Sequence, residues 1–176
     1  MRFCMKFHVW FAIANTFWIY CAMTVPTDKA VALVRALSNA ETDNEIYEAV
    51  YALHQYSLNN LDDLLKTEII FILASTIETL TCESTLDLCV PTIHVLSDRP
   101  GAKNEIADQG IVELLFEKLS MYKHNSYIKY VILKTLKDLI KYKHAMQRLR
   151  DVSGVIDTLK SFEDYYADCI LEKMEQ

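Results

Sequence analysis

The sequence predicts an all-α protein built from stacked helical repeats. The chain has 176 residues but only three glycines and three prolines, whereas a strand-rich fold needs many more turn residues. Apolar residues recur every three or four positions through most of the chain, as they do on one face of a helix. Helix starts are expected near Asp43, Ser84 and Ser126. This regular spacing of about 42 residues is typical of repeat arrays, in which short helices stack to bury their apolar faces.

The first 25 residues differ in composition from the rest of the chain. Arg2 and Lys6 precede a run from Phe7 to Val25 that has no formally charged side chain, and this order is typical of a signal peptide. The run is also close to the length of roughly 20 residues that spans a bilayer. We therefore expect residues 1–25 to be a signal peptide or a membrane anchor. A buried first helix of the fold is the third interpretation.

After Pro26 the chain reads as a series of amphipathic helices. A short helix is expected over Asp28–Ser38. Thr42 and Glu45 then have the spacing of a capping box, in which each side chain satisfies a free N–H group at a helix start. The helix that follows places four apolar residues on one face: Ile46, Ala49, Val50 and Leu53.

A further helix is expected from Asn60 through Leu80, because acidic residues follow Asn60 and favour the positive end of a helix. Its centre, residues 69–74, is apolar on every side, so we expect this helix to be the most buried one. The next helix begins at Ser84, and Pro91 should kink it by removing a backbone hydrogen bond. Its apolar stripe is Leu86, Cys89, Val90 and Ile93, and the same pattern recurs 42 residues later at Ile128, Val131, Ile132 and Thr135.

Two glycines each open an apolar helix after a short polar one. Gly110 precedes IVELLFEKL, and Gly154 precedes VIDTLKSF. The segment SDRPGAKNEIADQGIVELL, residues 97–115, resembles an armadillo repeat, in which a polar turn and a short helix end before a glycine and an apolar run. HEAT repeats are similar, and the pattern does not separate the two. The resemblance is good over residues 84–162 and looser over residues 28–80.

This resemblance implies a short right-handed α–α superhelix of the armadillo or HEAT type over residues 26–163. An acidic C-terminal helix or tail would follow over residues 164–176. The long third helix of the best repeat would run from Tyr127 to Tyr142. Its core stripe is expected to be Ile128, Val131, Ile132, Leu136, Leu139 and Ile140.

Armadillo proteins hold extended peptides or partner domains on the concave surface that their third helices line. The face opposite the expected core stripe carries four residues at helical spacing: Tyr130, Lys134, Lys137 and Lys141. The resemblance implies that part of this face looks into the groove. A basic groove with a tyrosine would suit an acidic peptide or an acidic partner surface. The simpler interpretation is a solvated helix surface.

Charge is distributed unevenly along the chain. Residues 38–116 contain 14 acidic and three basic residues, whereas residues 117–150 contain nine basic and two acidic ones. The formal net charge of the whole chain is −6, which argues against general binding of nucleic acid, because affinity for phosphates comes mostly from cationic side chains.

No motif for catalysis, nucleotide binding or metal ligation is found. The chain has no P-loop, HExxH or CxxC sequence, and its histidines are scattered. Cys82, Cys89 and His94 are of ligand type, but their spacing matches no common zinc signature and Cys89 fits an apolar stripe. Cys169 lies among carboxylates and is a poor candidate for a reactive nucleophile. We therefore expect no enzyme, no metal and no cofactor.

The sequence thus predicts a non-enzymatic protein–protein interaction module that binds a peptide or a partner domain. Combined with a signal sequence, short armadillo repeats also resemble the nucleotide-exchange factors of heat-shock chaperones, especially the endoplasmic-reticulum form that acts on BiP. That resemblance implies a luminal chaperone partner. A third alternative is a membrane-anchored armadillo adaptor that retains residues 1–25. The expected location is the secretory pathway, either the endoplasmic-reticulum lumen or outside the cell, with membrane anchoring as the alternative.

Overall fold

The computed structural model describes residues 26–176, so the predictions for residues 1–25 lie outside the described residues. Residues 26–176 form ten helices and no strand, which confirms the all-α fold class. The helices are α2 (Asp28–Ser38), α3 (Asp43–Leu64), α4 (Ile69–Thr79), α5 (Glu83–Leu96), α6 (Pro100–Asp108), α7 (Ile111–Met121), α8 (Ser126–Leu139), α9 (Lys143–Arg150), α10 (Val155–Lys160) and α11 (Tyr165–Met174).

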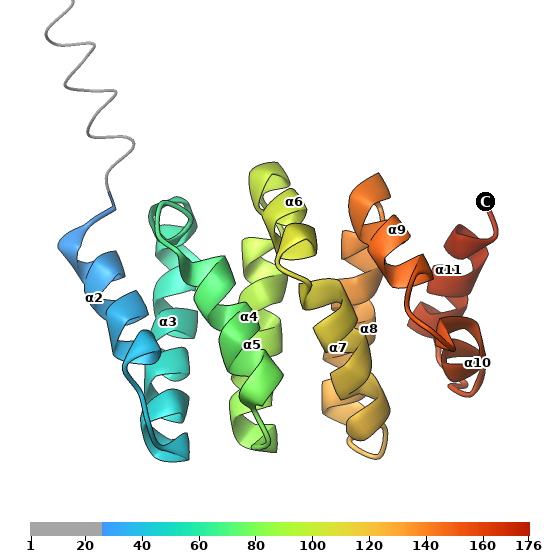
Figure 1. Cartoon of the computed structure of the whole chain (residues 1–176), viewed down its shortest axis with the longest axis horizontal. Coiled ribbons are helices and arrows are strands. Elements are labelled where there is room, and N and C mark those ends of the chain that lie inside the picture. Colours follow the sequence, from blue (N-terminus) through green and yellow to red (C-terminus); the bar gives the residue numbers. More distant parts are fainter. Residues whose placement is uncertain (1–25) are drawn as a thin grey trace, which may run out of the picture.

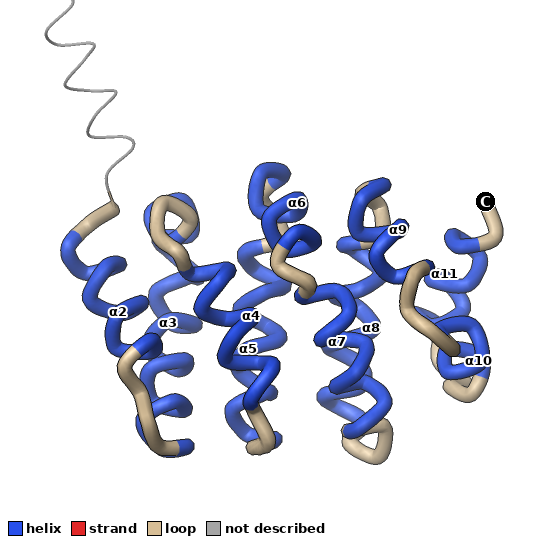
Figure 2. The backbone as a smooth tube through the Cα atoms, viewed as in Figure 1, coloured by secondary structure: helices blue, strands red, loops and turns tan. Residues whose placement is uncertain are grey.

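The helices form an elongated array with two main layers (Figure 1). A front layer contains α2, α4, α7 and α10, and a rear layer contains α3, α5, α8 and α11. Along the rear layer, α3 packs against α5, α5 against α8, and α8 against α11. The short helices α6 and α9 pack against each other along the upper edge (Figure 2).

The rear-layer helices carry the predicted repeat. They begin at Asp43, Glu83, Ser126 and Tyr165, at intervals of 40, 43 and 39 residues. The expected starts were therefore placed correctly to within one residue, and α11 adds a fourth start. Its packing against α8 and α10 makes α11 the last member of the rear layer.

Several helix starts have the local structure that the sequence predicted. Thr42 and Glu45 form the predicted capping box, with the Glu45 carboxylate accepting from the Thr42 N–H at 3.0 Å. Gly110 and Gly154 stand directly before α7 and α10 with φ values of 74° and 72°. These left-handed values are strained for any residue with a Cβ atom. Each glycine therefore permits the sharp turn between two consecutive helices.

The core consists of the apolar stripes facing the space between the layers. All four stripe residues on α5 are buried, and so are the six on and just after α8 that the sequence predicted. On α3, Ala49, Val50 and Leu53 are buried, and Ile46 packs partly buried against them. Helix α5 continues through Pro91 as a single helix. Of the helices in residues 26–176, none is long and apolar enough to cross a membrane.

Three predictions about helix extent and burial were wrong. No single helix runs from Asn60 to Leu80: Asn60 has a non-helical φ and ψ of −134° and 38°, and a turn over residues 65–68 separates α3 from α4. In that turn, the Thr67 hydroxyl donates to the Leu64 carbonyl and competes with the backbone ladder. Helix α4 is not the most buried helix: five of its 11 residues are buried, compared with six of 11 in α7, and Phe71 is 52% exposed.

The third error concerns the end of α8. This helix ends at Leu139 rather than at Tyr142, because the Tyr142 N–H donates to the Leu139 carbonyl in a tight turn that leads into α9. The periodicity of the sequence continues past the turn, so it did not indicate the end.

Candidate partner-binding surface

The four predicted binding residues do not form one continuous helix face. Tyr130, Lys134 and Lys137 lie on α8, on the side opposite its buried stripe, and Tyr130 is 43% exposed. Lys141 lies beyond the end of α8, in the turn before α9. Its ammonium group is 2.6 Å from the Asp138 carboxylate. Lys141 is therefore an exposed residue paired with Asp138 in the last turn of α8, and this pairing separates it from the other three.

Helix α11 places two tyrosines beside the remaining residues. The ring of Tyr166 packs edge-to-face on Tyr130, with centroids 5.5 Å apart, and on Tyr165, with centroids 5.4 Å apart. The Lys137 ammonium group lies 5.0 Å from the centre of the Tyr166 ring and 5.8 Å from that of Tyr165. We refer to Tyr130, Lys134, Lys137, Tyr165 and Tyr166 as the aromatic–lysine surface.

The hydroxyls of Tyr165 and Tyr166 stay protonated at neutral pH. Contact with the Tyr130 hydroxyl raises the pKa of Tyr166 above its usual range. Contact with the Cys169 thiol likewise raises the pKa of Tyr165. The Tyr165 and Tyr166 rings are therefore neutral, and the lysines give the surface its positive charge.

On the other side of α8, the surface borders His94 of α5. Burial lowers the pKa of His94, and the positive charge of Lys134 lowers it further. Burial alone would raise the pKa of Asp138, but the hydrogen bond and charge of Lys141 outweigh it and lower that pKa. Asp138 is thus ionised and already engaged by Lys141. Within residues 26–176, no carboxylate stands within salt-bridge distance of Lys134 or Lys137.

Other cations of the basic segment stabilise the fold. Arg148 of α9 lies 2.6 Å from the Glu113 carboxylate of α7. The Arg150 guanidinium donates to the Met174 carbonyl at 2.6 Å, near the end of α11. These contacts hold neighbouring helices together. Some of the basic residues in this segment are therefore engaged in contacts between helices.

Lys118 is the clearest structural cation. It is only 3% exposed, and its ammonium group donates to the carbonyls of Leu80 at 2.9 Å and Glu78 at 3.5 Å. These carbonyls lie at the C-terminal end of α4, where free acceptors and the helix dipole favour a cation. Lys118 thus ties α7 to α4 and is not available to a partner.

Sequence reasoning missed Tyr165 and Tyr166. Residues 164–176 were expected to be an acidic helix or tail outside the repeats, so no contact with α8 was considered. Two signals could have found them. Ala167 and Ile170 are three residues apart and buried, as on the apolar face of a helix, and the repeat period places a fourth rear-layer start near Asp164.

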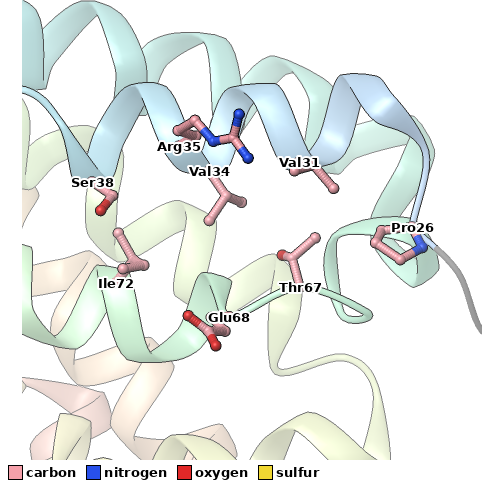
Figure 3. A pocket seen from close by; sticks show the side chains of 8 residues that line it. All are labelled: Pro26, Val31, Val34, Arg35, Ser38, Thr67, Glu68 and Ile72. Carbon is pink, nitrogen blue, oxygen red and sulfur yellow. The ribbon is translucent and has the colours of Figure 1, made fainter.

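Shallow cavities also lie elsewhere in the described chain. A shallow cavity of about 310 Å³ lies between α2 and the start of α4, and Figure 3 shows its lining. Its ionisable residues are Arg35 and Glu68, with Val31, Val34 and Ile72 among the apolar ones. Across residues 26–176, no three or more His, Cys, Asp or Glu side chains are grouped to hold a metal ion.

Comparison with known proteins places the chain in no family. No family model matches it, and no curated protein is significantly similar to it. The structure is compatible with a helical-repeat protein, whereas the assignment to armadillo or HEAT repeats stays a prediction from the sequence pattern.

Proposed function

We propose that this protein is a non-enzymatic interaction module of the armadillo or HEAT type that binds an acidic peptide or an acidic partner domain through the aromatic–lysine surface. The observation that carries the proposal is the combination of exposed tyrosines with lysines that have no carboxylate partner among residues 26–176. Tyr130 is 43% exposed and Tyr165 is 70% exposed. Lys134 and Lys137 stand on the same side of α8 as Tyr130.

Each component of the surface supplies a different part of the binding energy. Tyrosine offers a large apolar ring and a hydroxyl at low conformational cost, and it is enriched among residues that dominate binding. Lysines attract an acidic partner during approach and disfavour basic ones. The tyrosine rings also position the Lys137 ammonium group, so less conformational freedom is lost when a carboxylate binds it.

The proposal is tested with fluorescent peptides of equal length, one rich in Glu, one rich in Lys and one neutral. We expect only the Glu-rich peptide to bind, with an affinity that falls as salt is added. Lys134→Glu combined with Lys137→Glu should abolish this binding and leave helicity nearly unchanged. The matched control is Lys123→Glu with Lys143→Glu, which makes the same charge change at two exposed lysines outside the surface.

Equal losses of affinity in both double variants would show that only net charge matters, and the surface assignment would be wrong. In a second experiment, proteins captured from the native source are tested for binding to the same two double variants. A partner of the proposed kind must bind the control variant and fail to bind the surface variant.

For the location, we propose the secretory pathway, with residues 1–25 removed as a signal peptide. The support is the composition of those residues, and membrane anchoring is the alternative. An intact-mass measurement on the protein from its native source distinguishes the two, because cleavage would leave an N-terminus at or near Val25. The BiP exchange activity stays a prediction from resemblance. It would be tested by measuring ADP release from purified BiP.

A further inference from the structure

A second exposed aromatic patch lies on α3, at the opposite end of the rear layer from α8 and α11 (Figure 1). Tyr47 and Tyr51 stack one helical turn apart, with ring centroids 6.5 Å apart, and Tyr51 is 46% exposed. Leu58 follows two turns after Tyr51 on the same side of the helix and is 54% exposed. The buried residues of α3, such as Ala49 and Leu53, lie on a different side. The patch therefore faces out of the array.

The patch on α3 is negatively charged. Helix α3 contains five acidic residues and no lysine or arginine. Glu45 forms the capping box, Asp62 pairs with an arginine, and Asp63 accepts hydrogen bonds from two hydroxyl groups. Asp43 and Glu48 are exposed, and within residues 26–176 no cation stands within salt-bridge distance of either. Their carboxylates are therefore free to meet a partner.

This patch has the same composition as the aromatic–lysine surface, with the opposite charge. We refer to Asp43, Tyr47, Glu48, Tyr51 and Leu58 as the aromatic–acidic surface. Both surfaces combine exposed tyrosines with charges that have no partner among residues 26–176. Tyrosine is enriched at protein interfaces, and complementary charges attract across them. Each surface thus offers what the other would bind.

One copy of the chain cannot bring its own two surfaces together. Helix α5 packs between α3 and α8, and it holds the two ends of the rear layer apart. Two copies can make the contact, because a two-fold axis reverses the order of the rear-layer helices in the second copy. The α3 end of each copy then approaches the α8 and α11 end of the other. Both contacts form at once, so the assembly closes as a dimer.

We propose that the acidic partner of the aromatic–lysine surface is the aromatic–acidic surface of a second copy of this chain, in a symmetric dimer. This inference rests on the proposed function, since it names the partner of the same surface. The opposite charges draw the two copies together, and the exposed tyrosines supply apolar contact area. An acidic peptide would compete with the second copy for Lys134 and Lys137.

Analytical ultracentrifugation of the purified protein tests for the dimer. At low salt we expect the average mass to rise from that of one copy toward about twice that value between about 5 μM and 500 μM protein. Added salt should lower the average mass again, because it screens exposed charges. A mass of one copy at every concentration would overturn the proposal. A mass that keeps rising beyond two copies would also overturn it, because the contact would then be open and head-to-tail.

The Glu-rich peptide distinguishes this inference from the proposed function. If the peptide binds a chain that stays monomeric, the dimer is wrong and the proposed function stands. If the peptide fails to bind at the lowest protein concentration, where the aromatic–lysine surface is free, the proposed function itself is contradicted.

Charge exchange identifies the surfaces that meet. Lys134→Glu with Lys137→Glu makes both ends of the rear layer acidic, whereas Glu48→Lys with Gln55→Lys makes the α3 end basic; Gln55 is exposed on the same side of α3. Each double variant alone should self-associate at least about tenfold more weakly. An equimolar mixture of the two should form a 1:1 complex, because opposite charges then meet at both contacts. A mixture that does not associate would overturn the proposal.

Two matched double variants control for net charge. Lys123→Glu with Lys143→Glu repeats the first charge change outside the aromatic–lysine surface. Glu117→Lys with Ser120→Lys repeats the second at exposed positions of α7, in the front layer. Both controls should self-associate as the unaltered protein does. Equal weakening in the controls and the surface variants would assign the effect to net charge and overturn the proposed interface.

Discussion

The ammonium group of Lys137 on α8 lies 5.0 Å from the centre of the Tyr166 ring on α11. This contact joins a lysine that the sequence singled out to a helix that the sequence left outside the repeats. It also gives Lys137 a role in the fold, because the cation and the ring attract each other. The aromatic–lysine surface therefore depends on the docking of α11 against α8.

A double-mutant cycle tests this coupling. Lys137→Met and Tyr166→Leu should each lower the melting temperature by about 2 °C, and the double variant should lose less than the sum, because the second change removes no further contact. Thermal unfolding followed by circular dichroism provides the measurement. Strictly additive losses would mean that the two side chains do not interact.

Replacing a glycine with alanine should lower the free energy of unfolding at two positions and raise it at a third. Gly110→Ala and Gly154→Ala should each destabilise the protein by about 1–2 kcal/mol, because alanine is strained at positive φ. Gly101→Ala should instead stabilise by about 0.5 kcal/mol, since Gly101 lies in α6 and an added Cβ would meet no atom within 4 Å. Urea unfolding measures all three. A stabilising effect at Gly110 or Gly154 would contradict the turn geometry.

Two histidines should make stability fall in mildly acidic solution. Burial lowers the pKa of both His54 and His94, so the folded state favours their neutral forms. This contribution is fully present above the unfolded pKa of about 6.5 and is lost as the pH falls through the folded pKa values. Between pH 7.5 and pH 5.5 we expect a loss below about 1 kcal/mol, because both rings are partly exposed.

The matched variant for this prediction is His54→Gln combined with His94→Gln. It should show a smaller loss of stability over the same interval when urea unfolding is repeated at both pH values. An unchanged pH dependence would assign the effect to other groups.

Features that depend on neighbouring residues could be predicted from the sequence. The capping box at Thr42 and Glu45 is a contact over three residues, and the glycine before α7 meets a purely local demand for positive φ. The buried stripe of α8 follows from the helical period alone. Such signals were sufficient to predict the all-α class and the residues at which the repeats begin.

Features that depend on distant residues were decided only by the tertiary structure. The burial of Lys118 requires the carbonyl of Leu80 at the end of another helix, and the charge count of residues 117–150 did not distinguish this lysine from the other basic residues. The surface at Tyr130 requires Tyr166, 36 residues later in the chain. Sequence periodicity determined which side of each helix faces the core. It could not determine which side chains of neighbouring helices meet outside the core, because that depends on how the helices pack in three dimensions.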